Sequence, residues 1–577
     1  MSLEEIKAKL QAASDTKEGL LTQISDLYIK KIRSNDEALK GALADLHNSG
    51  DIDLVNIVSV VDKASIEYNS FSILSAFEST LPSLNSSVED VLHCLVLIKQ
   101  QTGRDMAIGG AYQRFCKAEN HRPKDSVKFI LEQSELSTYA SFLSSSILSF
   151  NSNQMIEAIQ MIESLVASAN KMVRSQAYLT LGNIDVDEAH ACAIWELLYS
   201  STTSEQENSC RAGILRAIIF FGGRFPSYWP QIEDLISTTF DDTNKEVLYV
   251  ISELVAFQSV TLPKSILNIL LKKLANVSPE HTGTIDNIDH LLVRLISNDT
   301  PSVAVELLES ILAVGVKVSM LDYFSNELLS KHQELLNHIT TKWFLSGTSS
   351  LCSGVSELVN DLTSKDLTLE AEIELLEQGI KQEFVSHKAV GWLFTRPIAA
   401  ASFILSIYNV ASTTTRKQLE QVLYEPLLLS YPGELKQFFQ SCIDKGMNEN
   451  LCERLLNRLQ AYHSGIEQVS GLNELMAPSE NLSAYWRESN KDMQAAYEKA
   501  SRSSFISQIA TTQKLLYGNS SIYYVHQGDG DQVRQEVQMR SFSHSTEMPR
   551  LNVLDPENLD YTLRVYRHER LKSEVDS

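Results

Sequence analysis

The 577-residue sequence predicts a mainly α-helical protein: a right-handed α-solenoid of antiparallel helix hairpins with a small C-terminal α+β module. Three observations carry this prediction. Helical segments recur with a 37-residue spacing, helix-breaking residues are few (13 Pro and 23 Gly), and the pattern becomes strand-like after Tyr517. We therefore expect stacked hairpins that bury a continuous core between two layers of helices.

The repeat is clearest in the middle of the chain. Val173, Ala177 and Leu181 lie on one face of an amphipathic helical segment. The apolar pattern returns twice in 37-residue steps, at Cys210, Ile214 and Ile218, and then at Val247, Ile251 and Val255.

The segment from Asn170 to Gly182 resembles the second helix of a HEAT repeat. That pattern has an acidic residue or Asn, then Val-Arg, Ala and Leu-Gly, which are Asn170, Val173-Arg174, Ala177 and Leu181-Gly182 here. The next unit keeps the arginine as Arg211, whereas the third has Leu248 in its place. The period of 37 lies between about 34 for TPR and about 40–47 for HEAT and armadillo repeats. The resemblance implies a superhelical scaffold and no chemistry, so Arg174 is interpreted as a structural residue.

The pattern divides the chain into four segments. Irregular N-terminal helical repeats are expected over 1–124, the HEAT-like solenoid over 125–315, further helical solenoid over 316–480, and a C-terminal helix with a small β-sheet over 481–577. Within the third segment, Glu370–Gln382 predicts an amphipathic helix and Tyr424–Gly433 a compact loop.

The last segment supplies the strand signals. Ile522–Val525 and the alternating Val533 and Val537 predict a β-hairpin with a four- to five-residue loop. Two more strands are expected, at Leu551–Leu554 and within Tyr561–Arg570.

Charge and cysteine content narrow the class of protein. A formal net charge of −23 disfavours nucleic acid as a general ligand, because such binding draws its affinity from neutralised phosphates. The charge serves solubility, or alternatively steers a partner with a basic surface. Seven cysteines without a CxxC pair indicate free thiols in a reducing compartment. The apolar stretch Ile398–Val410 is shorter than the ~20 residues that span a bilayer. We expect a cytoplasmic protein without a membrane segment.

The sequence contains no short motif that indicates a cofactor, a metal or a reaction. Walker, dinucleotide, HExxH and GxSxG patterns do not occur. His281, Asp286 and His290 come nearest to a metal cluster, but a solvated loop is the favoured interpretation. HEAT-like folds include DNA glycosylases with a basic concave surface. Such a face could be formed here by Arg224 with Phe225, Tyr228 and Trp229. The favoured interpretation is that these side chains pack between repeats. We expect no cofactor and no metal.

The candidate binding site is the expected strand at Tyr561–Arg570. On a strand, Arg564 and Tyr566 share one face while Arg567 lies on the other. Arginine at a sheet edge can bind carboxylates bidentately, and it can equally protect the edge from pairing with another chain. Arg564, Tyr566 and Arg567 are therefore the predicted partner-binding residues.

These observations favour a non-enzymatic scaffold or adaptor that binds one or more proteins through an extended solenoid surface, for example as a subunit of a multi-protein bacterial assembly. The alternative is a nucleic-acid-processing factor or an enzyme component, for example in phage defence, in which the solenoid positions the C-terminal module. The sequence does not decide whether the protein is an enzyme, and the favoured interpretation is that it is not.

Overall fold

The computed structural model describes residues 2–32, 37–61, 70–102, 106–240, 244–258, 262–298, 300–360, 366–469, 487, 491, 494–495, 498, 520–526, 532–538, 547 and 556–571. The chain forms two compact units, Met1–Val277 (unit 1) and Ser278–Ser577 (unit 2).

Unit 1 is built of helices joined by short connections. They are α1 (Leu3–Ala12), α2 (Lys17–Ile32), α3 (Ala38–Asn48), α4 (Leu54–Val58), α5 (Ser70–Thr80), η1 (Leu81–Ser83), α6 (Val88–Thr102), α7 (Met106–Lys117), α8 (Arg122–Glu132), α9 (Leu136–Tyr139), α10 (Phe142–Ile147), η2 (Ser152–Gln154), α11 (Met155–Val166), α12 (Lys171–Asn183), α13 (Glu188–Ser204), α14 (Asn208–Arg224), η3 (Pro226–Tyr228), α15 (Trp229–Thr239), α16 (Lys245–Phe257) and α17 (Lys264–Leu274).

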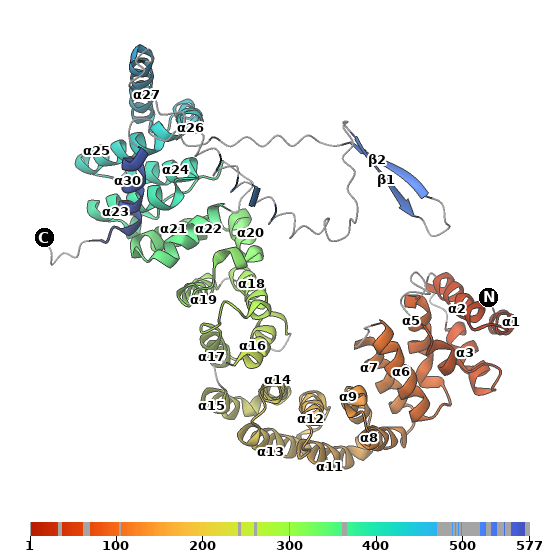
Figure 1. The fold of residues 1–577 in the computed structure, drawn as a ribbon. Helices are drawn as coiled ribbons and strands as arrows, with labels where there is room; N and C mark the ends of the chain where they lie inside the picture. Colours follow the sequence, from red (N-terminus) through yellow and green to blue (C-terminus); the bar gives the residue numbers. More distant parts are fainter. Residues whose placement is uncertain are drawn as a thin grey trace. The chain divides into compact units, whose positions relative to one another are not determined.

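The helices of unit 1 stack in two layers (Figure 1). In one layer α10, α12, α14 and α16 pack in succession, and in the other α11, α13, α15 and α17 do so. Each hairpin joins the layers, as α11 packs on α12 and α13 on α14. Because the helices from α10 to α17 pack on the next helix of their own layer and on their hairpin partner, unit 1 contains a helical-repeat solenoid.

The 37-residue register is visible in the structure. Helices α12, α14 and α16 begin at Lys171, Asn208 and Lys245, 37 residues apart. The nine apolar positions that the sequence places in register are all buried: Val173, Ala177, Leu181, Cys210, Ile214, Ile218, Val247, Ile251 and Val255. Asn170 and Asn244 are the N-cap residues of α12 and α16, and their side chains accept hydrogen bonds from backbone amides of the first turn.

Unit 2 continues with helices and contains one hairpin among its described residues. Its elements are α18 (Thr282–Ser297), α19 (Pro301–Ala313), η4 (Val318–Met320), α20 (Asp322–Lys331), α21 (Gln333–Ser346), α22 (Ser349–Asn360), η5 (Ile373–Leu375), α23 (Gly379–Leu393), α24 (Pro397–Tyr408), α25 (Thr413–Val422), η6 (Leu423–Leu428, a π-helical turn), α26 (Pro432–Asp444), α27 (Glu449–Val469), β1 (Ser520–His526), β2 (Gln532–Gln538) and α30 (Pro556–His568).

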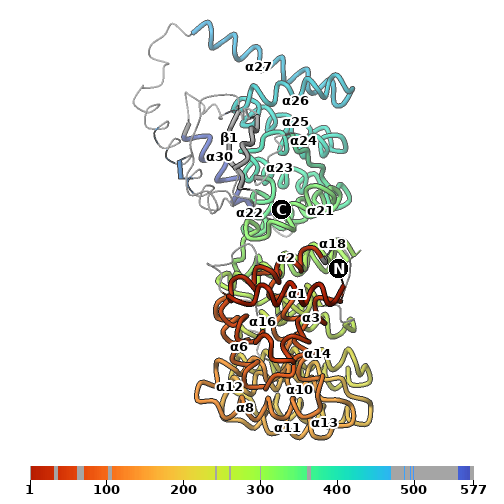
Figure 2. Tube along the Cα trace, turned by 90° about the vertical axis from the view of Figure 1, so that its right-hand side faces the viewer, coloured from red at the N-terminus to blue at the C-terminus, as the bar shows by residue number. Residues whose placement is uncertain are grey.

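Helix α23 is the central helix of unit 2. It packs against α21, α22, α24 and α25, and α30 lies along it in both views (Figures 1 and 2). Helices α24 and α26 also pack on each other. None of the described helices is long and apolar enough to cross a membrane. The seven cysteines are free, and all except Cys192 are buried.

The prediction of a strand within Tyr561–Arg570 is wrong, because these residues belong largely to α30. Pro556 occupies the first position of the helix, where its missing N–H costs nothing, and Glu557 follows in the first turn. The aromatic and β-branched residues that favour a strand are overruled by packing, since Leu559 and Leu563 lie one turn apart and are both buried.

Two further predictions in unit 2 need correction. Residues 370–378 are not α-helical, and α23 begins at Gly379. The backbone amides of residues 369–372 donate at 2.9–3.0 Å to side chains on α21 and α24, among them Asn337 and Ser402, and these bonds replace helical ones. The loop expected at Tyr424–Gly433 is a π-helical turn leading into α26, because Leu427 and Leu428 are buried.

The hairpin in the C-terminal segment is two-stranded. Strands β1 and β2 pair antiparallel, with Val525 opposite Val533, and five residues separate them. The strand expected at Leu551–Leu554 lies outside the described residues, and so does most of the stretch from 481 to 519 that precedes the hairpin, so the α+β module stays a prediction.

Candidate interaction surface

Helices α12 and α14 approach each other closely in unit 1. A Cβ atom added at Gly182 would lie 2.9 Å from Cα of Ala217, so only glycine permits this approach. At Gly213 the nearest atom to an added Cβ would be Cβ of Tyr178 at 3.7 Å, an ordinary van der Waals distance. Small residues thus leave a groove between the two helices.

The groove has a volume of about 230 Å³ and extends to α16. We call it the α12/α14/α16 groove. Its lining combines small, polar and apolar side chains: Ser175, Gln176, Tyr178, Leu179, Gly182, Asn183, Ser209, Ala212, Gly213, Arg216, Ala217, Phe220 and Val250.

Two polar atoms in this lining are buried without a hydrogen-bond partner among the described residues. They are Oε1 of Gln176, an acceptor, and Nε of Arg216, a donor. The guanidinium of Arg216 is held by an ion pair between its Nη2 atom and Glu253 on α16. The unpaired burial of such an atom costs about 1–3 kcal/mol.

Exposed apolar side chains occur on two of the three helices that line the groove. Met172 and Leu179 on α12 are 40% and 39% exposed, and Tyr249 and Phe257 on α16 are 46% and 53% exposed. Side chains of this size on a water-facing layer indicate a surface that another molecule can cover.

These groove residues were missed by the sequence analysis, although the repeat carries a signal for them. Gln176, Gly213 and Val250 are spaced by 37 residues, and so are Leu179, Arg216 and Glu253. The register therefore identifies equivalent positions on the exposed face of each repeat, just as it identifies the buried ones.

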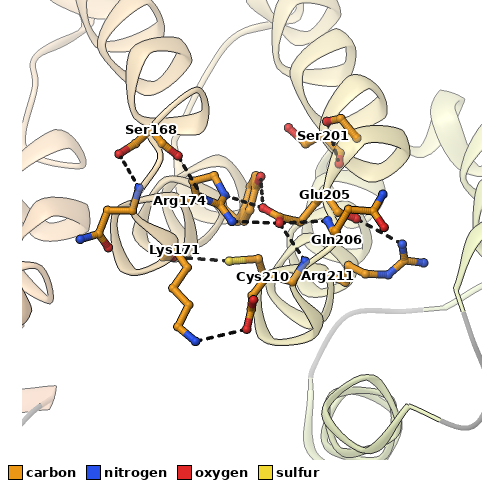
Figure 3. A network of polar contacts seen from close by, with 12 residues as sticks. Ser168, Lys171, Arg174, Ser201, Glu205, Gln206, Cys210 and Arg211 are labelled. Carbon is orange, nitrogen blue, oxygen red and sulfur yellow. Dashed lines mark hydrogen bonds and ion pairs between the residues drawn. The ribbon is translucent and has the colours of Figure 1, made fainter.

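A network of polar contacts joins two hairpins beside the groove (Figure 3). Nε and Nη2 of Arg174 donate to the Glu205 carboxylate at 2.7 and 3.0 Å, while Nη1 donates to the carbonyl of Ser168 at 3.0 Å. The hydroxyl of Tyr178 donates to the same carboxylate at 3.0 Å. The other Glu205 oxygen accepts from the backbone amide of Glu207 at 3.0 Å.

The network sets the protonation of its members. Burial favours the neutral form of Glu205, but hydrogen bonds from Arg174, the Glu207 amide and Tyr178 outweigh it and hold the pKa of Glu205 at about 2. Burial and the bond to Glu205 raise the pKa of Tyr178 well above its ordinary value. The Glu205 carboxylate also raises the pKa of Arg174, so this pair is a permanently charged clamp.

The same clamp position recurs one repeat later. Arg211 lies 37 residues after Arg174, and its guanidinium donates to the carbonyl oxygens of Glu205 and Thr239. In the third repeat the position is taken by Leu248, which is fully buried. The arginines therefore tie hairpins together, and neither lies at a site built for a reaction.

The aromatic group near Arg224 packs between repeats. Arg224 donates to the carbonyl oxygens of Ile184 and Gly182 at the end of α12, and burial lowers the pKa of its guanidinium. The rings of Phe225 and Tyr228 pack on Phe221, with centroids 4.9 and 5.0 Å apart. This arrangement is a packed junction and not a basic concave face.

The histidines near residue 285 are not gathered into a cluster. His281 precedes α18, while the His290 ring lies against Tyr323 with centroids 4.3 Å apart. No group of three residues that could hold a metal occurs in the part of the chain that the structure describes.

The three predicted partner-binding residues lie on α30, and the structure separates them. Arg564 is 70% exposed and pairs with Asp560 one turn earlier at 2.8 Å. Tyr566 stacks on His387 of α23, with centroids 4.2 Å apart, and Nε of Arg567 donates to the Gly391 carbonyl at 2.5 Å. Two of the three therefore hold α30 on α23, and their role toward a partner stays a prediction.

No family model and no curated protein matches the chain. Among solved structures it is similar at 13% identity to one described as APUM23-GGAGUUGACGG, over 73% of this chain and 79% of that one, with a TM-score of 0.23. Another is a circular tandem repeat protein with novel repeat topology and enhanced subunit contact surfaces, at 12% identity over 87% and 97% of the two chains, with a TM-score of 0.13. TM-scores this low do not show a shared fold. The helical-repeat architecture is therefore established by the stacked hairpins themselves.

Proposed function

We propose that the protein is a non-enzymatic scaffold that binds a protein partner across the layer formed by α12, α14 and α16. The observation that carries the proposal is a groove whose lining residues Gln176 and Arg216 each contain a polar atom without a partner among the described residues, on helices that also expose apolar side chains. A peptide group offers one donor and one acceptor, which is what these two atoms lack.

The finer parts of the proposal concern the class of scaffold and its partner. The HEAT-like type, a right-handed superhelix, an α+β C-terminal module and a cytoplasmic location belong to it as expectations. The net charge of −23 supports a partner with a basic surface, which long-range attraction would steer to the scaffold.

The test is affinity purification of the tagged full-length chain from cells that produce it, followed by quantitative mass spectrometry. Leu179→Glu places a charge on the groove rim. Leu131→Glu is the matched control, because Leu131 on α8 is similarly exposed at 43% and does not line the groove. We expect a partner at fixed stoichiometry with the wild type and the control, and its loss with Leu179→Glu.

Recovery of the same proteins with both variants would contradict the proposed surface. Nuclease treatment before elution separates the alternative function: a co-purifying protein that disappears with the nucleic acid would favour a nucleic-acid-processing factor. Retention on heparin near physiological salt would point the same way.

A further inference from the structure

Helix α30 docks on unit 2 through one face only. Leu559 and Leu563 are buried, Tyr566 is largely covered, and the intervening Asp560, Tyr561 and Arg564 are exposed. Apolar anchors at positions i, i+4 and i+7 are how an amphipathic helix binds in a groove of a receptor protein. Helix α23 is the element on which α30 packs (Figure 1).

The receptor side contains a buried lysine that binds main-chain atoms. The side chain of Lys388 on α23 is fully buried, and its Nζ atom donates to the carbonyl oxygens of Arg567 and Glu569 at 2.6 and 2.7 Å. These carbonyls belong to the C-terminal end of α30, where a helix leaves acceptors unpaired and attracts positive charge. Burial lowers the pKa of Lys388, so the two carbonyls offset the cost of placing this ammonium out of water.

Neighbouring residues recognise side chains of the docked helix. Nδ1 of His387 lies 2.8 Å from the Glu569 carboxylate, and the His387 ring stacks on Tyr566 with an interplanar angle of 7°. Gly391 allows the close approach, since a Cβ there would lie 3.1 Å from the backbone nitrogen of Arg567. We call His387, Lys388 and Gly391 the α23 cradle.

A second contact holds the C-terminal segment at another helix of the same unit. The carboxylate of Glu547 accepts from the backbone amides of Gly433 and Glu434 at 2.8 and 2.6 Å. These amides belong to the first turn of α26, where the helix dipole and the free N–H groups favour an anion. The chain thus contacts unit 2 both ahead of α30 and along it.

We propose that the α23 cradle is a receptor site for a helical peptide, that α30 is its built-in occupant, and that a partner helix of the same chemistry replaces α30. Such a helix carries apolar residues at i and i+4, an aromatic residue at i+7 and a carboxylate at i+10. It ends there, so that its last carbonyl oxygens face Lys388. This surface is separate from the α12/α14/α16 groove, and the proposal stands or falls independently of it.

The geometry supports an exchangeable occupant. A helix of 13 residues is marginal by itself in water. Here α30 buries Leu559 and Leu563, stacks Tyr566 on His387, and makes polar contacts at its C-terminal end. A peptide with the same anchors can make the same contacts as α30. It replaces α30 when its concentration exceeds the local concentration of the tethered helix, which is on the order of millimolar.

The test uses the full-length chain and a fluorescent peptide of residues 556–571. Leu559→Asp with Leu563→Asp removes the anchors of α30 and leaves the cradle intact. We expect this released variant to bind the peptide by fluorescence anisotropy, and the wild type to bind it at least tenfold more weakly because its own helix occupies the site. A peptide with Arg564→Ala should bind equally well, since Arg564 faces solvent.

Changes in the cradle decide whether binding is specific. Lys388→Met in the released variant should abolish binding, and His387→Gln should weaken it several-fold, with circular dichroism confirming that each variant is folded. Three outcomes would overturn the proposal: a folded released variant that does not bind the peptide, equal binding by wild type and released variant, or a concentration-dependent dimer of the wild type that dissociates when the α30 anchors are removed.

Discussion

Glu205 is the residue through which the α11–α12 and α13–α14 hairpins are joined. Its side chain is 4% exposed and accepts hydrogen bonds from Arg174, Tyr178 and two backbone amides. A carboxylate so held is stabilising only while it is ionised, because each of these groups donates to it.

Stability should therefore depend on pH through Glu205. Its pKa in the folded protein is about 2, below the ordinary 4.5, so its contribution is complete above pH 4.5 and is lost as pH falls toward 2. The contribution amounts to roughly 3 kcal/mol. We expect Glu205→Gln to lower the midpoint of thermal unfolding at neutral pH, and the gap from wild type to close over that acid range. A gap independent of pH would contradict the clamp; Glu188→Gln, at an exposed position, serves as the control.

At this scale the sequence could predict the buried repeat positions and not the residues of the α12/α14/α16 groove. Val173, Cys210 and Val247 are apolar residues at a fixed spacing, so the hydrophobic effect alone places them inside. Oε1 of Gln176 and Nε of Arg216 have no hydrogen-bond partner among the described residues, and this depends on what surrounds them in three dimensions. Lys388 is fully buried and donates to a carbonyl oxygen of α30, a helix that lies far from it in the sequence, so no local pattern indicates its environment.

Between elements, the approach of α12 to α14 rests on a missing side chain. Gly182→Ala would place a methyl group 2.9 Å from Cα of Ala217, where backbone cannot yield easily. We expect a loss of roughly 1–3 kcal/mol in unfolding free energy. Gly213→Ala is the matched control on the facing helix and should be neutral or stabilising by up to about 1 kcal/mol, because space is available and alanine favours helix.

Thermal unfolding monitored by circular dichroism compares the two variants. Equal effects of Gly182→Ala and Gly213→Ala would show that α12 and α14 are not in close contact at Gly182.

Element boundaries could be predicted where periodicity and capping agree. Helix α16 covers Lys245–Phe257, as the pattern indicates, with Asn244 as its N-cap. Residues 370–378 are amphipathic in sequence, yet their backbone amides bond to side chains of α21 and α24, which no local pattern reveals. Thr562, Val565 and Tyr566 favour a strand, whereas helix α30 forms against α23, which is distant in the sequence.

Across the whole chain, contacts between neighbouring repeats should limit how far a local change is felt. Each repeat is stabilised by its neighbours, so damage fades along the array. We expect Gly182→Ala to accelerate amide hydrogen exchange in α12 and α14 most strongly, less in α10 and α16, and not in α24 and α26. Uniform acceleration throughout the chain, measured by mass spectrometry, would contradict a nearest-neighbour array.

The net charge of −23 acts at the same scale. If the partner presents a basic surface, the rate constant for its association with this protein should fall about tenfold or more as the NaCl concentration is raised. The dissociation rate constant should change little. Stopped-flow measurement over a series of NaCl concentrations distinguishes this from an apolar contact, whose association rate is nearly independent of salt.

Site-specific photocrosslinking in living cells tests most directly whether the α12/α14/α16 layer is a protein-binding surface. A photoreactive amino acid is placed at Leu179 on the groove rim, and in a parallel chain at Leu131 on α8, which is similarly exposed. Our account predicts a discrete protein adduct from position 179 and none of the same mass from position 131. Identical adducts from both positions, or adducts with nucleic acid alone, would contradict it.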